Sequence, residues 1–258
     1  MDLSRYLPTK SMVSTALWAA TLSVASGHVA PAVDTNNRYL KLSPRGDRVR
    51  FAYTVFFGDI PGAVARQAQD LDRDGQLSEP ERRAFGHRLA EQVAAGLRIE
   101  IDGVPVPVRW DDAEVGLGTT AVAAGSFAVD LVTEICISAD VDPHHISLRD
   151  SWEIPNPGET EIIIEDGPGI RIDRARLGGF DNPSHTYLIH GRDTTLSNQG
   201  LDVRFRIGST WRASGRCAGK APSGHTNHKK WRWIVGTGVV AAVGLTCAWH
   251  MKRRRRTT

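Results

Sequence analysis

The stretch Asp70-Leu-Asp-Arg-Asp-Gly-Gln-Leu-Ser-Glu-Pro-Glu81 carries carboxylates at its first, third, fifth and twelfth positions. This is the spacing of an EF-hand loop, which surrounds calcium with about six to eight oxygen ligands. The sequence therefore predicts a calcium site. Its expected ligands are the side chains of Asp70, Asp72, Asp74, Ser78 and Glu81 and the backbone carbonyl of Gln76.

The remaining positions of this loop also fit a calcium loop. Gly75 stands at the sixth position, where the backbone must turn sharply, and Leu77 supplies an apolar residue at the eighth. Ser78 and Glu81 also have the spacing of a capping box for a following helix. The alternative is a solvated acidic turn. The match at every side-chain ligand position favours calcium.

Helices are expected on both sides of the loop, over residues 59–69 and about 80–96. In the second helix Phe85, Leu89 and Val93 recur every four residues and continue to Leu97, which gives one apolar stripe. Gly86 is expected to cost this helix some stability. The sequence thus predicts an EF-hand helix–loop–helix over residues 59–97, with its calcium loop at 70–81.

The rest of residues 28–213 is predicted to be β-sheet. Apolar and polar residues alternate over 49–57 and 126–138, and 97–108 is typical of two strands joined by an Asp-Gly turn. Further short strands are expected at 38–42, 145–149, 160–165, 169–173, 186–190 and 201–207. The predicted fold class is α+β, a mostly antiparallel β-sandwich with one inserted EF-hand helix–loop–helix.

The N-terminal residues 1–27 are typical of a signal peptide. Arg5 and Lys10 precede an apolar segment that is short for a membrane span and ends in small residues. Cleavage after Gly27 would leave His28 at the new N-terminus, and cleavage after Ala32 is the competing choice. The sequence therefore predicts an exported protein.

Residues 231–251 are predicted to form one transmembrane helix. The uncharged, Gly/Ala/Val-rich segment runs from Trp233 to Met251, and a basic cytoplasmic tail follows at 252–258. Residues 214–230 are expected to be a flexible stalk. This predicts a single-pass membrane protein whose domain 28–213 lies outside, in the periplasm or extracellular space, with its C-terminus in the cytoplasm. A bacterial sorting signal, whose span is later removed, is the alternative.

The charge of the chain is unevenly distributed. The whole chain has a net charge of +3, of which residues 1–27 contribute +1 and residues 229–258 contribute +8, so that residues 28–228 carry −6. The basic pI of the chain is therefore due to the membrane anchor and gives no argument for nucleic acid. A mildly acidic outer domain suits cation binding.

Three other features of the sequence bear on its chemistry. Cys136 and Cys217 lie in an oxidising compartment and could form a disulfide or remain two thiols. His144 and His145 are expected to point to opposite faces of a strand and to be solvated. The chain contains no Gly-x-Ser-x-Gly elbow, no His-Glu-x-x-His motif and no phosphate-binding loop. No enzyme activity is predicted.

The order of motifs from His28 to about Val108 resembles a known exported domain. It is the N-terminal, EF-hand-containing domain of bacterial nickel/cobalt-exporter-like and hydrogenase/urease-accessory-type membrane proteins. The matching segments are Asn37-Arg38-Tyr39, Phe57-Gly58-Asp59-Ile60-Pro61, the loop 70–81 and the strand turn Leu97 to Gly103. Leu148-Arg149-Asp150 and Pro157-Gly158-Glu159 are similar to a downstream element of that family.

The resemblance implies a sensing or accessory domain associated with metal-transport membrane proteins. Family members continue into several transmembrane helices, whereas this sequence has one predicted span, so we do not expect it to transport by itself. We expect a calcium-braced binding or accessory domain with a membrane protein as a possible partner. A cell-surface adhesion or assembly module is the alternative, and a hydrolase whose residues converge only in the fold is the third hypothesis.

Overall fold

The computed structural model describes residues 33–138, 141–208 and 217. The predicted signal peptide, the candidate span 233–251, the basic tail and all of the stalk except Cys217 lie outside these residues. Within the described ranges, no helix has the length and apolar character that crossing a membrane requires.

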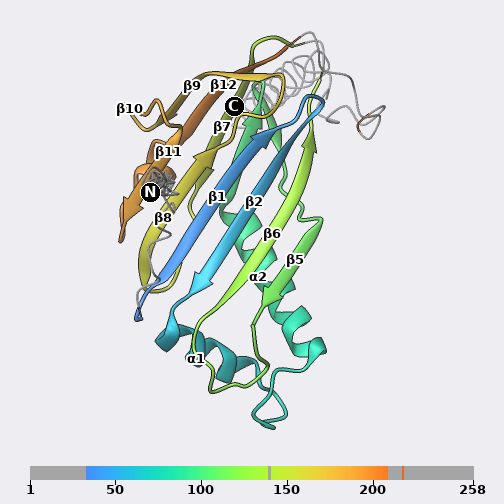
Figure 1. The fold of residues 1–258 in the computed structure, drawn as a ribbon, viewed down its shortest axis with the longest axis vertical. Coiled ribbons are helices and arrows are strands. Elements are labelled where there is room, and N and C mark those ends of the chain that lie inside the picture. The colour runs from blue at the N-terminus through green and yellow to red at the C-terminus, as the bar shows by residue number, and fades with distance from the viewer. Residues whose placement is uncertain (1–32, 139–140, 209–216, 218–258) are drawn as a thin grey trace, which may run out of the picture. The chain divides into compact units, whose positions relative to one another are not determined.

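Twelve strands form two six-stranded sheets, so the described part of the chain is a β-rich α+β fold, as predicted. The first sheet has the order β11-β8-β1-β2-β6-β5 (Figure 1). Its strands are β1 (Asn36–Pro44), β2 (Arg48–Phe57), β5 (Asp112–Gly116), β6 (Phe127–Cys136), β8 (Pro157–Ile164) and β11 (Thr186–His190). The pairing of β1 with β8 is parallel, whereas the other pairings in this sheet are antiparallel.

The second sheet has the order β10-β9-β12-β7-β3-β4, and its pairings are antiparallel. Its strands are β3 (Leu97–Ile101), β4 (Val104–Val106), β7 (His144–Asp150), β9 (Ile170–Leu177), β10 (Phe180–Asp181) and β12 (Leu201–Ile207). All the strands predicted from the sequence are present, some with shifted ends. Sequence reasoning missed β5, β10 and the short helix α3 (Thr195–Asn198).

The hairpin between β1 and β2 shows why these residues form strands. Val49, Phe51, Tyr53 and Val55 alternate with less buried residues and face the core. A tight turn joins the strands, in which the Arg45 N–H donates to the Arg48 carbonyl at 2.7 Å and Gly46 has a φ of 67°. The left-handed conformation at this position favours glycine.

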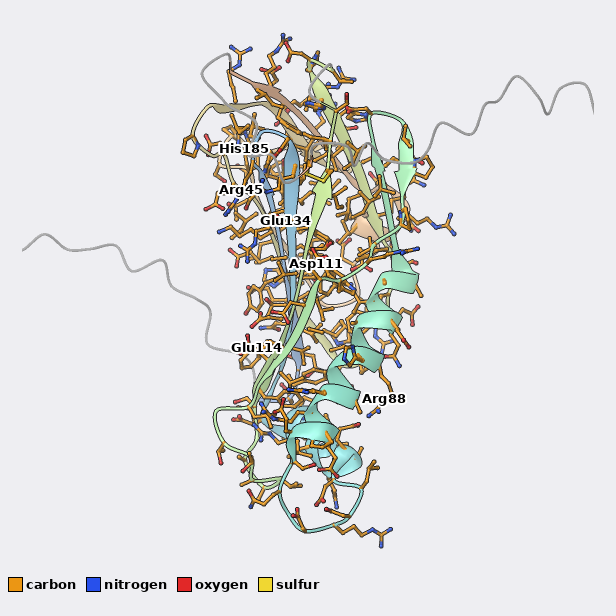
Figure 2. The ribbon with its side chains drawn as sticks, turned by 90° about the vertical axis from the view of Figure 1, so that its right-hand side faces the viewer. Arg45, Arg88, Asp111, Glu114, Glu134 and His185 are labelled. Carbon is orange, nitrogen blue, oxygen red and sulfur yellow. A yellow bond between two sulfur atoms is a disulfide. The ribbon has the colours of Figure 1, made fainter. Side chains whose placement is uncertain are left out.

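Two helices precede the second sheet, α1 (Asp59–Gln69) and α2 (Glu79–Gly96). Leu89 and Val93 of α2 are buried in the same apolar core as the strands, as the predicted stripe requires. Phe85 contacts the rings of Phe57 and Phe127, 5.9 Å away in each case. Figure 2 shows Arg88 on the side of α2 that is turned away from the strands.

A buried polar network joins the two sheets. Arg38 of β1 donates from Nη1 to Asp150 Oδ2 of β7 at 2.9 Å, and the Tyr53 hydroxyl of β2 donates to the same oxygen at 2.8 Å. Burial is the main reason why the pKa values of Asp150 and Tyr53 are raised. Arg38 also donates to the Thr160 hydroxyl at 3.0 Å, so its guanidinium group is neutralised and bonded inside the fold.

Two expectations about special residues can be compared with the structure. Cys136 and Cys217 form a disulfide, with Cα atoms 5.6 Å apart. The prediction that His144 is solvated was wrong. His144 is fully buried, its Nδ1 lies 2.9 Å from Asp102 Oδ2, and its ring stacks on Phe205. The alternation of β7 turns His144 inward together with Ile146 and Leu148.

Candidate metal centre

The loop 70–81 begins at the C-terminal end of α1 and runs into the first turn of α2. Asp70 caps α1 and Ser78 caps α2. Arg73 and Gly75 have φ values of 62° and 81°, so the loop turns sharply at both residues. A Cβ atom on Gly75 would meet no atom within 4 Å, so it is the left-handed backbone and not crowding that favours glycine here.

The structure brings Asp70, Asp72 and Asp74 together. One carboxylate oxygen from each of them lies within 4.8 Å of the other two. Two oxygens bound to one calcium ion at 2.3–2.6 Å are at most about 5 Å apart. The separation of these three oxygens therefore fits calcium. In the described part of the chain this is the one group of three or more such side chains that is close enough for a shared ion.

Backbone amides of the loop hold these carboxylates in place. Asp70 Oδ1 accepts from the Asp74 N–H and its Oδ2 from the Gly75 N–H, both at 3.1 Å. Asp72 Oδ1 accepts from the Asp74 N–H at 3.2 Å, and Asp74 Oδ1 from the Gln76 N–H at 2.7 Å. These bonds point the carboxylates toward one another despite their like charge. Each carboxylate oxygen has a further lone pair for a cation.

Glu81 and Ser78 lie at the edge of this group and contact each other. Glu81 Oε1 accepts from the Leu71 N–H at 2.7 Å, and its Oε2 accepts from the N–H and the hydroxyl of Ser78 at 2.9 and 2.7 Å. These bonds, led by the one from the Ser78 hydroxyl, lower the pKa of Glu81. The predicted capping box is present. Glu81 is not within the close group of three aspartates.

A segment of the β domain, residues 117–126, pairs with the loop. The Leu77 N–H donates to the Thr120 carbonyl at 2.8 Å, and the Val122 N–H donates to the Gly75 carbonyl at 3.0 Å. Gln76 lies opposite Ala121, and its side-chain oxygen accepts from the Thr120 hydroxyl at 2.6 Å. Leu77 is buried in the core. The sequence offers no second complete EF-hand loop, and this segment supplies the backbone pairing instead.

Arg66 of α1 holds the segment 117–126 in place. Its side chain is fully buried and donates to five backbone carbonyls, over distances of 2.7 to 3.3 Å. The acceptors are the carbonyls of Leu117, Thr119, Ala121, Gly125 and Ser126. The guanidinium carbon also lies 5.1 Å from the centre of the Phe127 ring. Burial lowers the pKa of Arg66. Sequence reasoning missed this residue because arginine on a helix is expected to be solvated.

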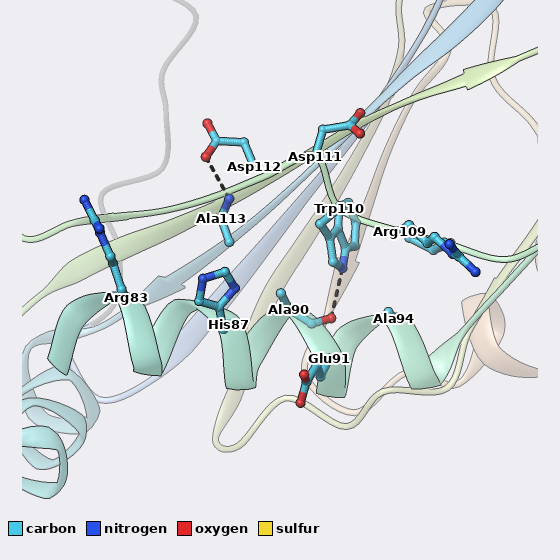
Figure 3. A pocket seen from close by; sticks show the side chains of 11 residues that line it. Arg83, His87, Ala90, Glu91, Ala94, Arg109, Trp110, Asp111, Asp112 and Ala113 are labelled. Atoms are coloured by element: carbon cyan, nitrogen blue, oxygen red, sulfur yellow. Dashed lines mark hydrogen bonds between the residues drawn. The ribbon is translucent and has the colours of Figure 1, made fainter. Parts of the chain in front are cut away.

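A groove of about 520 Å³ lies between α2 and the segment that leads into β5 (Figure 3). Trp110 is one of its lining residues, and its ring nitrogen donates to the Ala90 carbonyl at 2.9 Å. Asp112 accepts from the Ala113 N–H and Asp111 from the Glu134 N–H, both at 2.9 Å. Both carboxylates therefore accept hydrogen bonds from backbone amides. His87 and Glu91 also line the groove, and the hydrolase hypothesis stays untested.

Comparisons with known proteins give no further guide to the site: no protein-family model matches the chain, and no curated protein matches it. The resemblance to exported EF-hand domains therefore stays a prediction. The function has to be argued from the residues and their geometry.

Proposed function

We propose that this protein is a calcium-binding, membrane-anchored extracytoplasmic module in which calcium braces the fold. The proposed ligands are the side chains of Asp70, Asp72, Asp74, Ser78 and Glu81 and the carbonyl of Gln76. The observation that carries the proposal is the close group of three aspartate oxygens, held by loop amides between two helices.

The chemistry of these donors favours a hard cation. Carboxylate, hydroxyl and carbonyl oxygens suit calcium or magnesium, and no sulfur or imidazole ligand is present in the loop. Calcium accepts more ligands and a more flexible geometry than magnesium, which suits a loop with six donors. A bound cation would offset the repulsion among the three carboxylates and tie the end of α1 to the start of α2.

The free energy expected from calcium binding favours a structural brace over a conformational switch. A lone loop of this kind belongs with the weak extracellular sites, whose dissociation constants are about 10⁻⁴–10⁻³ M. With a dissociation constant of ~0.1 mM and ~1 mM calcium outside the cell, binding stabilises the folded state by about 1.4 kcal/mol. A two-state switch needs roughly 5 kcal/mol of differential binding energy.

An accessory role requires a partner surface, and exposed apolar side chains of α1 and of the loop offer one. Ile60 and Val64 lie one turn apart on α1 and are 59% and 63% exposed, and Leu71 of the loop is 73% exposed. We assign this surface to a membrane-protein partner, in line with the resemblance to metal-transport systems. Adhesion or assembly through the same surface is the alternative. The candidate span 233–251 would hold the domain at the membrane.

Calorimetric titration of the full chain in detergent with calcium tests the proposal. We expect sub-millimolar binding by the native protein and none by the Asp72→Asn variant. The matched control is Glu114→Gln, which removes an exposed carboxylate of β5 outside the loop (Figure 2) and should leave the affinity unchanged. No heat of binding up to several millimolar calcium, or equal losses in both variants, would contradict it.

A further inference from the structure

The outer face of the second sheet is rich in arginine. On β3, β7, β9 and β12 the positions that alternate with the buried residues carry seven arginines but three acidic residues, and these four strands contain no lysine. The arginines are Arg98, Arg149, Arg171, Arg174, Arg176, Arg204 and Arg206, and the acidic residues are Glu100, Asp173 and Asp202. Residues 28–228 as a whole carry a net charge of −6, so this face departs from the charge of its domain.

Arginines stand directly opposite one another on neighbouring strands of this face. Arg171 of β9 pairs with Arg206 of β12, and Arg174 pairs with Arg204. Like charges at directly opposite positions destabilise a sheet. Two such pairs in succession therefore concentrate positive charge at a cost in stability. A bound anion would offset that cost.

The first of these pairs is partly neutralised by one aspartate. A bulge between Arg204 and Phe205 in the register of β12 with β9 leaves Asp173 as an extra residue. Asp173 accepts from Arg171 Nε at 2.9 Å and from Arg206 Nε at 2.7 Å. Arg206 also lies 3.6 Å from a carboxylate oxygen of Asp142.

The second pair has little compensation within the fold. Arg174 Nε is buried yet makes no hydrogen bond, and its nearest carboxylate, on Asp181, is 3.9 Å away. Arg204 is exposed and has no ion pair or side-chain hydrogen bond with any residue that the structure describes. The exposed guanidinium group of Arg204 therefore keeps its donors free at the centre of the face, whereas Arg174 adds positive charge beside it. Arginine presents its donors as a planar fork that fits phosphate oxygens.

The position of this face in the chain indicates where the anion comes from. Arg206 is the penultimate residue of β12, the last strand that the structure describes, and the chain continues from there to Cys217, which forms the disulfide with Cys136. Residues 218–232 then lead to the candidate span, and 15 residues reach at most about 50 Å. The chain between this face and the bilayer that the span would enter is therefore short enough for the face to reach that bilayer.

We propose that Arg171, Arg174, Arg204 and Arg206, here called the arginine face, dock on the phosphate groups of anionic phospholipids in that bilayer. This inference rests on the proposed membrane anchorage but not on calcium binding. Docking would fix the orientation of the outer domain over the membrane. The attraction falls with salt, as for other basic surfaces near anionic lipids.

Footprinting with phenylglyoxal, which modifies accessible guanidinium groups, tests the proposal on the full chain in nanodiscs. Discs contain phosphatidylcholine alone or phosphatidylcholine with phosphatidylglycerol, and mass spectrometry measures modification at each arginine. We expect the arginine face to be modified several-fold more slowly in the anionic discs, with protection lost in high salt. Arg83 of α2, whose side chain is 73% exposed, should react equally in both. Equal modification of the arginine face in both discs would overturn the proposal.

Two double variants test whether the protection depends on where the arginines lie on the sheet. Arg174→Glu with Arg204→Glu should abolish the protection of Arg171 and Arg206. Arg98→Glu with Arg149→Glu, the opposed pair at the other end of the sheet, should leave it intact. The same loss of protection in both double variants would contradict a specific face.

Two further experiments distinguish lipid phosphate from a free phosphate compound, and distinguish failure of the membrane anchorage from failure of the arginine face. Equal protection in neutral discs after addition of glycerol phosphate would identify a site for a small anion and overturn docking on lipid. A chain that does not enter discs would refute the anchorage. Its sedimentation with anionic but not with neutral vesicles would then still support the arginine face, and failure to sediment with either would refute that as well.

Discussion

At the scale of single residues, two buried arginines are held in different ways. Arg38 faces the carboxylate of Asp150, whereas the partners of Arg66 among the described residues are backbone carbonyls and one aromatic ring. Removing either arginine would leave buried acceptors without donors. Neither arginine could be placed from sequence periodicity, because charged residues are expected at the surface.

Replacing Arg66 should loosen the segment that pairs with the metal loop. Arg66→Met leaves five backbone carbonyls without this donor, and we expect it to lower the free energy of unfolding by about 3–5 kcal/mol. Hydrogen exchange should become faster at the amides of Leu77 and Val122. Arg82→Met, which removes one 3.3 Å bond to the Val115 carbonyl and the ion pair with Glu79, is the matched control. Similar exchange at these two amides in both variants would count against this role of Arg66.

Replacing only one partner of the Arg38–Asp150 pair should destabilise the protein more than replacing both. Asp150→Asn leaves the guanidinium group buried without a counter-charge, which costs about 3–5 kcal/mol. Replacing both residues, with Arg38→Met and Asp150→Leu, should cost less than the single change, because no buried charge remains. Urea denaturation measures both. A double variant that is less stable than the single one would refute this account of the network.

At the scale of elements, α2 depends on how closely it approaches β5. From helix propensity alone, Gly86 is expected to destabilise α2. In the structure a Cβ atom at Gly86 would lie 3.1 Å from the Ala113 carbonyl oxygen and 3.1 Å from Val115 Cγ2. Packing therefore overrides helix preference at this residue. Sequence reasoning missed β5 because only Val115 of this strand is buried and two of its five residues are acidic.

Alanine at Gly86 should therefore destabilise the protein. We expect Gly86→Ala to cost about 1–3 kcal/mol, because the methyl group pushes α2 away from β5. Gly116→Ala in β5, where the nearest atom to the new Cβ would be 3.8 Å away, should be neutral or slightly stabilising. Thermal unfolding of the two variants gives the comparison. A Gly86→Ala protein as stable as the native one would show that α2 has room to move.

At the scale of the whole molecule, the sequence predicted α1, α2, most of the strands and the loop. It did not predict the parallel pairing of β1 with β8, because that contact joins segments more than 100 residues apart and leaves no local pattern. The role of segment 117–126 was hidden for the same reason. The inward position of His144 could have been found, since Ile146 and Leu148 share its alternation.

Stability should fall in acid. Hydrogen bonds lower the pKa of Glu81, led by the Ser78 hydroxyl, and of Glu165, led by the Ser43 hydroxyl. Such groups stabilise the fold above the pKa of the unfolded chain, about 4.5, and this stabilisation is lost as the pH falls through the lower folded value. The pKa of Asp150 is raised, so its effect on stability has the opposite sign. The stabilisation that comes from this raised pKa is lost as the pH rises through it.

Urea midpoints measured between pH 3 and 7 check this expectation. The native protein should lose stability below pH ~4.5, and Glu165→Gln should lose less over the same interval because one of the titrating groups is gone. A variant with an unchanged pH profile would show that Glu165 does not contribute to the acid sensitivity.

Thermal unfolding of the full chain with and without calcium, beside the Glu81→Gln variant, tests the central claim most directly. About 1.4 kcal/mol of binding energy at ~1 mM calcium should raise the melting temperature of the native protein by about 3–6 °C. The variant, which lacks one carboxylate at the twelfth position of the loop, should show little or no rise. A native protein whose melting temperature does not change with several millimolar calcium, or an equal rise in both proteins, would contradict calcium as a brace at this loop.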